Sequence, residues 1–261
     1  MILIQSPLEQ FEVVNLISLN APLLGYLNLS LTNFSLYSII VFILVIGIHL
    51  LFRGPAFIAN NFHTKLVPST WNIALESSYA SINSIVREQI GVRNEIYLPF
   101  IYSLFFFIII SNLIGNTPYS FTITTSIILS VGLGFTIFIG VTIIALFKHG
   151  LHFFSFFIPG GTPLGLVPLL VLIEVISYLA RALSLGVRLF ANMMAGHTLL
   201  KILSTFLYQL FTSSILIAIL TLIPFAIFVA LIGLEIAVSI IQAYVFVLLT
   251  SSYLKDAIEL H

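Results

Sequence analysis

Cysteine is absent from this chain of 261 residues, and charged residues make up only 7% of it. The lack of cysteine excludes disulfide bonds and thiolate metal sites. Soluble domains carry about 25% charged residues, so the scarcity of charge excludes an ordinary soluble domain. The net charge is zero, which leaves no basic surface for nucleic acid. No GxxxxGK[ST], GxGxxG or HExxH motif is present, so neither nucleotide binding nor zinc chemistry is predicted.

What remains is hydrophobic, at 60% of the residues. A helix needs about 20 apolar residues to cross a bilayer, and the chain holds several such runs. We predict an all-α integral membrane protein, a single membrane domain over residues 1–261, with five membrane-embedded helices and one amphipathic surface helix. The expected membrane segments are residues 34–52, 98–114, 123–147, 165–211 and 214–253.

The segment 69–91 has a different pattern. Ser69 and Thr70 after a proline predict a helix start, and Gly91 predicts its end. Its apolar residues fall in one stripe about 100° wide at helical spacing. The segment is therefore predicted to lie on the membrane surface rather than to cross it. The stripe consists of Trp71, Leu75, Tyr79, Ile82, Val86 and Ile90.

Three glycines, Gly132, Gly134 and Gly140, lie in the segment 123–147. They would allow a neighbouring helix to approach closely, but glycine is also generally frequent in membrane helices. Ordinary glycine usage is the favoured interpretation.

The last two segments are too long for simple membrane helices. At 1.5 Å per residue, one helix over 165–211 would be about 70 Å long, whereas the hydrocarbon core is about 30 Å thick. The helix must tilt steeply, break or leave the membrane. The segment 214–253 poses the same problem, with Pro224 and Gly233 as candidate bends. We predict a hairpin of two long, steeply tilted helices that turns at residues 212–214.

Basic residues predict the orientation of the chain. The N-terminal segment 1–33 contains no Lys or Arg, and basic connections alternate with non-basic ones over all five spans. The N-terminus is therefore expected outside and the C-terminus inside. Residues 1–5 are too short for a signal peptide, which leaves a trimmed leader or simply the start of the chain. The basic residues of the inner connections and the C-terminus are Arg53, Lys65, Arg87, Arg93, Lys148 and Lys255.

Ionisable residues concentrate in the last two segments. Arg188 is the most informative of them, because a guanidinium stays charged and costs about 2.5–3.5 kcal/mol at the bilayer centre by insertion scales. When the two helices are folded about residues 213–215, residues face each other where their numbers sum to about 430. Three polar pairs share this register: Glu174 with Asp256, Arg188 with Gln242, and His197 with Glu235.

Helical angles refine this arrangement. Two polar stripes result, one on each helix: Glu174, Arg181, Arg188 and Asn192 on the first, and Glu235, Ser239 and Gln242 on the second. His197 lies about 180° around the helix from Arg188. Acid–base groups thus form two clusters with a permanent cation between them, which is the pattern of two aqueous half-channels separated by a block.

Two other interpretations remain open at this point. A secondary ion transporter would also place charges at the midplane, although such proteins show repeated halves and here the charges lie in one half without an internal repeat. A structural scaffold would leave the desolvation cost of Arg188 and Glu235 unexplained. Among the remaining ionisable residues, Lys201 is expected to snorkel outward, and Arg181 either anchors Glu174 or supports the neighbouring face.

His149 and His152 flank Lys148 at a spacing of three residues. Such a pair could bind a metal ion, but no third ligand is evident in the sequence, so solvated or interfacial histidines are expected.

Several motifs resemble subunit a of F-type ATP synthases, the proton-channel stator of the membrane sector. They are the run Arg181–Asn192 followed by Ala195-Gly196-His197, the pair Glu235 and Gln242, and the ending Tyr253-Leu254-Lys255-Asp256-Ala257. The start Ser6–Phe11 is similar to the mature start of fungal mitochondrial members, which implies that residues 1–5 are a removable leader. His197 with Glu235 is the mitochondrial pattern.

The resemblance implies a function. Protons would pass from the intermembrane space by Glu235 and His197 to a carboxyl group on a ring of rotor c subunits, and leave to the matrix near Glu174 and Asp256. Arg188 would attract each ionised rotor carboxylate and block leakage, with support from nearby polar residues. The chain would be a non-catalytic subunit of the mitochondrial inner membrane without a cofactor or metal, and its partners would be the c ring, the peripheral stalk b subunit and the bilayer, with no nucleotide bound directly. The supporting residues are Asn192, Gln242, Arg181 and Ser239.

Overall fold

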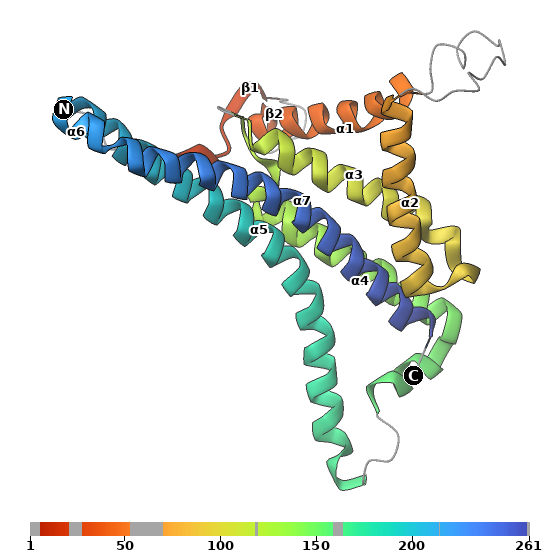
Figure 1. Ribbon diagram of the computed structural model, residues 1–261. Coiled ribbons are helices and arrows are strands. Elements are labelled where there is room, and N and C mark those ends of the chain that lie inside the picture. Colours follow the sequence, from red (N-terminus) through yellow and green to blue (C-terminus); the bar gives the residue numbers. More distant parts are fainter. Residues whose placement is uncertain are drawn as a thin grey trace, which may run out of the picture. The chain divides into compact units, whose positions relative to one another are not determined.

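The computed structural model describes residues 6–20, 28–52, 70–117, 120–158, 164–213 and 215–259. In these ranges helices dominate (Figure 1), and five of them are long and apolar enough to cross a membrane: α1, α3, α4, α5 and α7. The predicted all-α membrane class is confirmed. The helices are α1 Asn33–Phe52, α2 Thr70–Ile90, α3 Leu98–Gly115, α4 Ile127–His149, α5 Val167–Ser213, α6 Ile215–Leu220 and α7 Leu222–Ile258.

Some helix bounds differ from the prediction. The helix expected over 123–147 starts later, at Ile127, because Ile123–Thr125 form a separate 3₁₀ turn. Another 3₁₀ turn, Leu164–Leu166, precedes α5. The last helix runs past residue 253 to Ile258 and so includes Asp256.

The segment 214–253 is not one helix. It is interrupted at Thr221, between α6 and α7. Proline lacks an N–H group, so Pro224 cannot donate the helical hydrogen bond to the carbonyl of Leu220, and the interruption lies just before it. Pro224 itself occupies the first turn of α7, where proline is tolerated. The other candidate bend, Gly233, lies within α7, which continues through it without a break.

The described chain divides into two compact units. The first comprises residues 1–45, 107–126 and 189–243, and the second comprises residues 46–106, 127–188 and 244–261. The helices α1, α3, α5 and α7 contribute residues to both units.

The first unit contains a β-hairpin that the sequence analysis did not predict. The strands β1, Asn15–Asn20, and β2, Asn28–Thr32, pair antiparallel, with Ser18 opposite Ser30. Asn33 holds the incoming chain against the start of α1, because its carboxamide donates to the carbonyl of Glu12 and accepts from the N–H of Val14. Residues 12–14 are therefore held at the start of α1.

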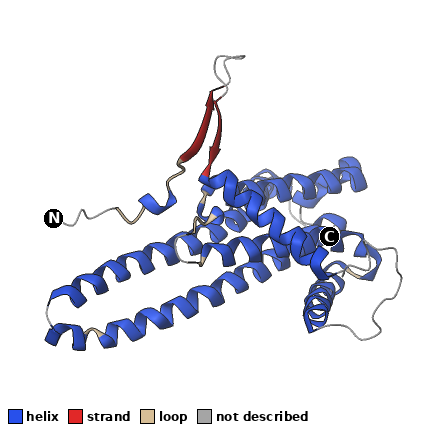
Figure 2. Ribbon diagram, turned by 90° about the horizontal axis from the view of Figure 1, so that it is seen from above, coloured by secondary structure: helices blue, strands red, loops and turns tan. Residues whose placement is uncertain are grey.

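In the first unit, the later part of α5 and the earlier part of α7 run antiparallel (Figure 2). The side chains of Leu189, Met193 and Ala243 are each at most 1% exposed. Ser239 of α7 is also fully buried. This packing brings polar residues of both helices into one interior, which positions the first candidate site.

In the second unit, α2 buries only part of its predicted stripe. Ile82, Val86 and Ile90 are buried as expected, whereas Trp71 is 66% and Tyr79 is 46% exposed. Gly91 ends the helix with a φ of 85°, a conformation that glycine adopts without steric cost. The predicted stop at this residue is therefore confirmed.

Two glycines of the second unit form a close helix crossing. A Cβ atom on Gly186 of α5 would lie 2.6 Å from Val131 Cα, and one on Gly134 of α4 would lie 2.8 Å from the carbonyl oxygen of Ala182. The favoured interpretation of ordinary glycine usage was thus wrong for Gly134. It holds for Gly132 and Gly140, where nothing lies within 4 Å of such an atom.

Many large apolar side chains of the long helices are exposed, such as Ile43 at 63%, Ile128 at 82% and Phe147 at 89%. Such extensive exposed apolar surface is unfavourable in water and is expected where a helix faces lipid. The proposed leader 1–5, the basic residues Arg53 and Lys65, and Ser69 and Ser214 lie outside the described residues.

Candidate functional site

Arg188 lies on α5 in the second unit, and its side chain is exposed. Its guanidinium Nη2 donates to Ser184 Oγ at 3.5 Å, a long contact within the same helix. No carboxylate of the described residues lies within ion-pair distance of it. The cation that the sequence predicts at midmembrane is thus exposed, with no acid of the described residues beside it.

His197 and Glu235 form the acid–base pair of the first unit. His197 Nδ1 of α5 lies 3.1 Å from Glu235 Oε1 of α7, and the two side chains are 14% and 9% exposed. The predicted contact is confirmed. The two atoms are at ion-pair distance, but the geometry between them is not that of a hydrogen bond. Glu235 Oε1 therefore has no hydrogen-bond partner in the described part of the chain. Gly196 makes room for the carboxylate, since a Cβ atom there would lie 2.8 Å from that oxygen.

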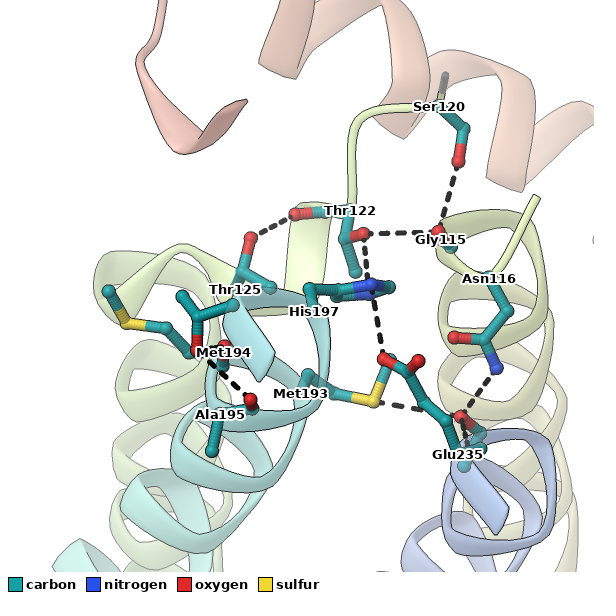
Figure 3. A network of polar contacts seen from close by, with 12 residues as sticks. Gly115, Asn116, Ser120, Thr122, Thr125, Met193, Met194, Ala195, His197 and Glu235 are labelled. Atoms are coloured by element: carbon teal, nitrogen blue, oxygen red, sulfur yellow. Dashed lines mark hydrogen bonds and ion pairs between the residues drawn. The ribbon is translucent and has the colours of Figure 1, made fainter. Parts of the chain in front are cut away.

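The other side of the His197 ring is also fixed. Its Nε2 lies 3.0 Å from Thr122 Oγ1, a hydroxyl on the loop that follows α3 (Figure 3). The ring of Phe11, from the N-terminal 3₁₀ turn Glu9–Phe11, lies 6.4 Å from the imidazole ring between centroids. Thr122 and Glu235 therefore orient the two ring nitrogens, and Phe11 covers the ring.

Polar contacts continue along α7 from Glu235. The hydroxyl of Ser239, one turn later, donates to the Glu235 carbonyl at 2.8 Å. Asn116 Nδ2 donates to Ser239 Oγ at 2.8 Å, and Asn112 Nδ2 donates to the Ser239 carbonyl at 3.3 Å. The predicted polar stripe of α7 thus has polar partners on α3 and on the residue that follows it.

A groove of about 260 Å³ separates α5 and α7 in the first unit. Asn192 and Gly196 line one side, and Leu231 and Glu235 line the other. A water molecule occupies about 30 Å³ of liquid, so the groove has room for several. It links the predicted supporting residue Asn192 to the acid–base pair.

The second unit holds an ionic triad. Arg181 Nη1 lies 3.1 Å from Asp256 Oδ2, and Arg181 Nη2 lies 3.7 Å from Glu174 Oε1. All three side chains are about one third exposed, at 36%, 32% and 30%. Glu174 and Asp256 were expected to face each other directly. The correction is that Arg181 lies between them, because two carboxylates are more stable around a shared cation than against each other.

Tyrosines of the second unit support this triad. Tyr253 Oη donates to the Arg181 carbonyl at 3.3 Å, which ties α7 to α5. The hydroxyls of Tyr178 and Thr142 lie 3.0 Å apart and tie α5 to α4. Both tyrosines also line a small cavity together with Arg181 and Asp256.

The remaining predictions on this site have mixed outcomes. Arg188 and Gln242 belong to different units, so their contact stays a prediction, as do the supporting roles of Asn192 and Gln242. His149 Nε2 lies 3.1 Å from the carbonyl oxygen of Ile258, and His152 Nδ1 lies 3.2 Å from Ser155 Oγ. No group of three potential metal ligands occurs among the described residues.

Three contacting residues were missed by the sequence analysis, namely Asn112, Asn116 and Thr122. They lie on or after α3, far from the hairpin in sequence, and no register between α5 and α7 reports on them. The sequence does contain a signal for the two asparagines, however. Asn112 and Asn116 are amides one helical turn apart at the end of an apolar segment, where polar side chains need partners.

The two clusters have distinct chemistry. His197 with Glu235 can take up and release a proton within a buried polar interior. The Arg181 triad holds two carboxylates at a partly exposed position. Arg188 holds a positive charge that cannot be relayed as a proton. The pair and the triad are each suited to one part of a proton path, and Arg188 is suited to interrupt that path.

Known proteins match this chain over nearly its full length. A protein-family model described as "ATP synthase A chain" matches residues 35–255. A protein named ATP synthase subunit a from Mycosarcoma maydis is 66% identical over 259 residues, covering 99% of both chains. Proteins of the same name from Emericella nidulans and Chondrus crispus are 52% and 44% identical, and each match covers 99% of this chain and 98% of the relative.

Proposed function

Because the chain belongs to the ATP synthase A chain family, we propose that it is subunit a, the proton-conducting stator of the membrane sector of an F-type ATP synthase. The single observation that carries this proposal is Arg188, a permanent cation exposed on a membrane helix with no acid of the described chain beside it. Such a charge is tolerated in a membrane only against a partner or water. The partner that fits is a carboxylate on another subunit.

The proposed path starts on the outer side. A proton reaches the His197–Glu235 pair, crosses the groove between α5 and α7, and neutralises a carboxylate on the ring of rotor c subunits. The neutral carboxyl group then turns through the lipid. Its proton is released on the inner side near Glu174 and Asp256, where Arg181 and solvent favour the ionised rotor carboxylate.

Arg188 keeps the two sides apart. At a separation of 4 Å and an effective dielectric constant of 20, opposite charges attract by about 4 kcal/mol, so each ionised rotor carboxylate is drawn to this position. The guanidinium cannot give up its proton, which blocks a direct path between the half-channels. The membrane potential supplies about 2.3 kcal/mol per charge per 100 mV.

The location and partners follow from the same proposal. The chain is a multi-pass protein of the mitochondrial inner membrane, with its N-terminus in the intermembrane space and its C-terminus in the matrix. It contacts the c ring, the peripheral stalk b subunit and lipid. It binds no nucleotide and performs no catalysis itself, because ATP is made in a separate head.

The test is Arg188→Ala in the assembled complex. We expect ATP synthesis and ATP-driven proton pumping to be lost while the complex still assembles. Lys201→Ala is the matched control, since it removes another cation of α5 and should leave synthesis near normal. Normal synthesis in Arg188→Ala would refute the proposal.

Crosslinking identifies the partner directly. The chain contains no cysteine, so a cysteine introduced beside Arg188, as in Val187→Cys, is its only thiol. Val187 is 45% exposed and available for contact. We expect it to form a disulfide with a cysteine placed beside the carboxyl of a c subunit. Failure to crosslink to any ring subunit, together with crosslinks between copies of this chain, would favour a transporter instead.

A further inference from the structure

Ser239 is the centre of a hydrogen-bond network whose orientation can be worked out. Its hydroxyl donates to the carbonyl of Glu235, and it is 0% exposed. Because that hydroxyl proton is already used, Ser239 Oγ accepts the bond from Asn116. A main-chain carbonyl only accepts, so the bond between Asn112 and the Ser239 carbonyl must come from the amide N–H₂ of Asn112.

The Asn112 carboxamide is therefore fixed, because a flip would place its oxygen against the Ser239 carbonyl. A flipped Asn116 would need the single hydroxyl proton of Ser239, which would then be lost to the Glu235 carbonyl, so the observed orientation is the one that keeps both bonds. It follows that Asn112 Oδ1 and Asn116 Oδ1 are directed away from Ser239. Figure 3 shows this for Asn116, whose nitrogen makes the dashed contact while its oxygen points elsewhere.

These two oxygens, like one carboxylate oxygen of Glu235, are buried without a hydrogen-bond partner among the described residues. The three atoms are Asn112 Oδ1, Asn116 Oδ1 and Glu235 Oε1. Buried acceptors in proteins are almost always satisfied by protein or by ordered water. Ser111, directly before Asn112 in the sequence, differs because its hydroxyl donates to the Phe107 carbonyl of its own helix at 2.6 Å.

We propose that Asn112 and Asn116 hold water against the Glu235 carboxylate, so that both are positioning residues of the outer proton path. The inference rests on the proposed function. When Glu235 gives up its proton, a water held there becomes a hydronium ion, whose O–H groups donate to the two carboxamide oxygens. The proton then leaves through further water, and the Glu235 carboxylate is free to accept the next one.

The direct test is a map of the complete ATP synthase at a resolution that shows ordered water. We expect density at hydrogen-bonding distance, about 2.5–3.2 Å, from the carboxamide oxygens of both asparagines. A dry interior at both oxygens would overturn the proposal. This measurement does not depend on any variant folding.

The functional test compares variants of α3 in the assembled complex. Asn112→Leu and Asn116→Leu should each lower passive proton conduction by about fivefold to tenfold, the effect of losing one hydrogen bond. Ser111→Ala should conduct normally, because that hydroxyl serves only its own helix. Equal losses in all three variants would indicate a general packing defect and would overturn the assignment.

One further variant separates water binding from simple tethering. Asn116→Asp keeps an acceptor oxygen but loses the amide that donates to Ser239. If the oxygen positions water, Asn116→Asp conducts far better than Asn116→Leu. If the amide tether is what matters, both variants are equally impaired, and the proposal fails.

The control for the underlying function is Arg188→Ala, measured in parallel. If that variant loses synthesis while the asparagine variants conduct normally, only the water site is wrong. If Arg188→Ala synthesises ATP normally, the proposed function fails as well.

Discussion

The close crossing of α4 and α5 makes Gly186 the most sharply defined position for a test. In Gly186→Ala the new methyl group would lie 2.6 Å from Val131 Cα and 2.7 Å from the carbonyl oxygen of Ser130. Both neighbours are main-chain atoms, which no side-chain rotation can move aside. To reach the 3.4 Å of ordinary contact, the two helices must separate locally by about 0.8 Å.

The expected cost follows from that displacement. Forcing an extra carbon into a close-packed contact typically costs about 1–3 kcal/mol, whereas glycine to alanine in a helix gains about 1 kcal/mol. The net effect should destabilise the subunit by up to about 2 kcal/mol. Arg188 lies two residues further along α5, and a shift of about 1 Å in a functional group can lower a rate a hundredfold. ATP synthesis per assembled complex should therefore fall by at least about tenfold.

Two assays check this prediction, namely the melting temperature of the purified complex and ATP synthesis normalised to assembled enzyme. Gly132→Ala is the matched control, since nothing lies within 4 Å of a Cβ atom there, and we expect unchanged or slightly higher stability. If Gly186→Ala melts and synthesises like Gly132→Ala, the crossing does not position Arg188.

Three further predictions concern the clusters. Glu235→Gln cannot ionise, so ATP-driven acidification of vesicles should fall by at least about tenfold while assembly is retained, and normal pumping would contradict its role. Asp256→Asn breaks an ion pair that is about one third exposed, so the melting temperature should change by the equivalent of less than about 1 kcal/mol while synthesis slows. Phe11→Ala should uncover His197 and speed its modification by diethylpyrocarbonate, as read by mass spectrometry. Leu8→Ala, at an exposed residue, should leave the modification rate of His197 unchanged. Equal modification rates in the two variants would show that Phe11 does not cover the ring.

The pairing of His197 with Glu235 could be predicted because the two residues lie on the two arms of one helical hairpin, α5 and α7, which only the short helix α6 separates in the sequence. In such a hairpin, the residue numbers alone fix which positions are opposite. The same register predicted Glu174 opposite Asp256, but it could not predict that Arg181 lies between them. A long arginine side chain reaches across more than one turn of a helix, and its rotamer depends on the neighbours.

The break at Thr221 shows a similar limit. Pro224 and Gly233 were both candidate bends, and only the surroundings decide whether a glycine bends a membrane helix. A proline has no N–H to donate in any setting, which is why the break at Thr221 lies just before Pro224, between α6 and α7. A lone glycine removes none, so α7 continues through Gly233.

The sequence by itself determined the membrane class, the number of long apolar helices and the position of the charged residues along them, because each depends on composition and spacing along one chain. Only the tertiary structure decided that Thr122 contacts His197 and that Asn112 and Asn116 contact Ser239, one turn after Glu235. It also showed that Gly134 and Gly186 form a close crossing. These contacts join elements far apart in sequence, so they depend on how helices pack against each other, which helical spacing does not encode.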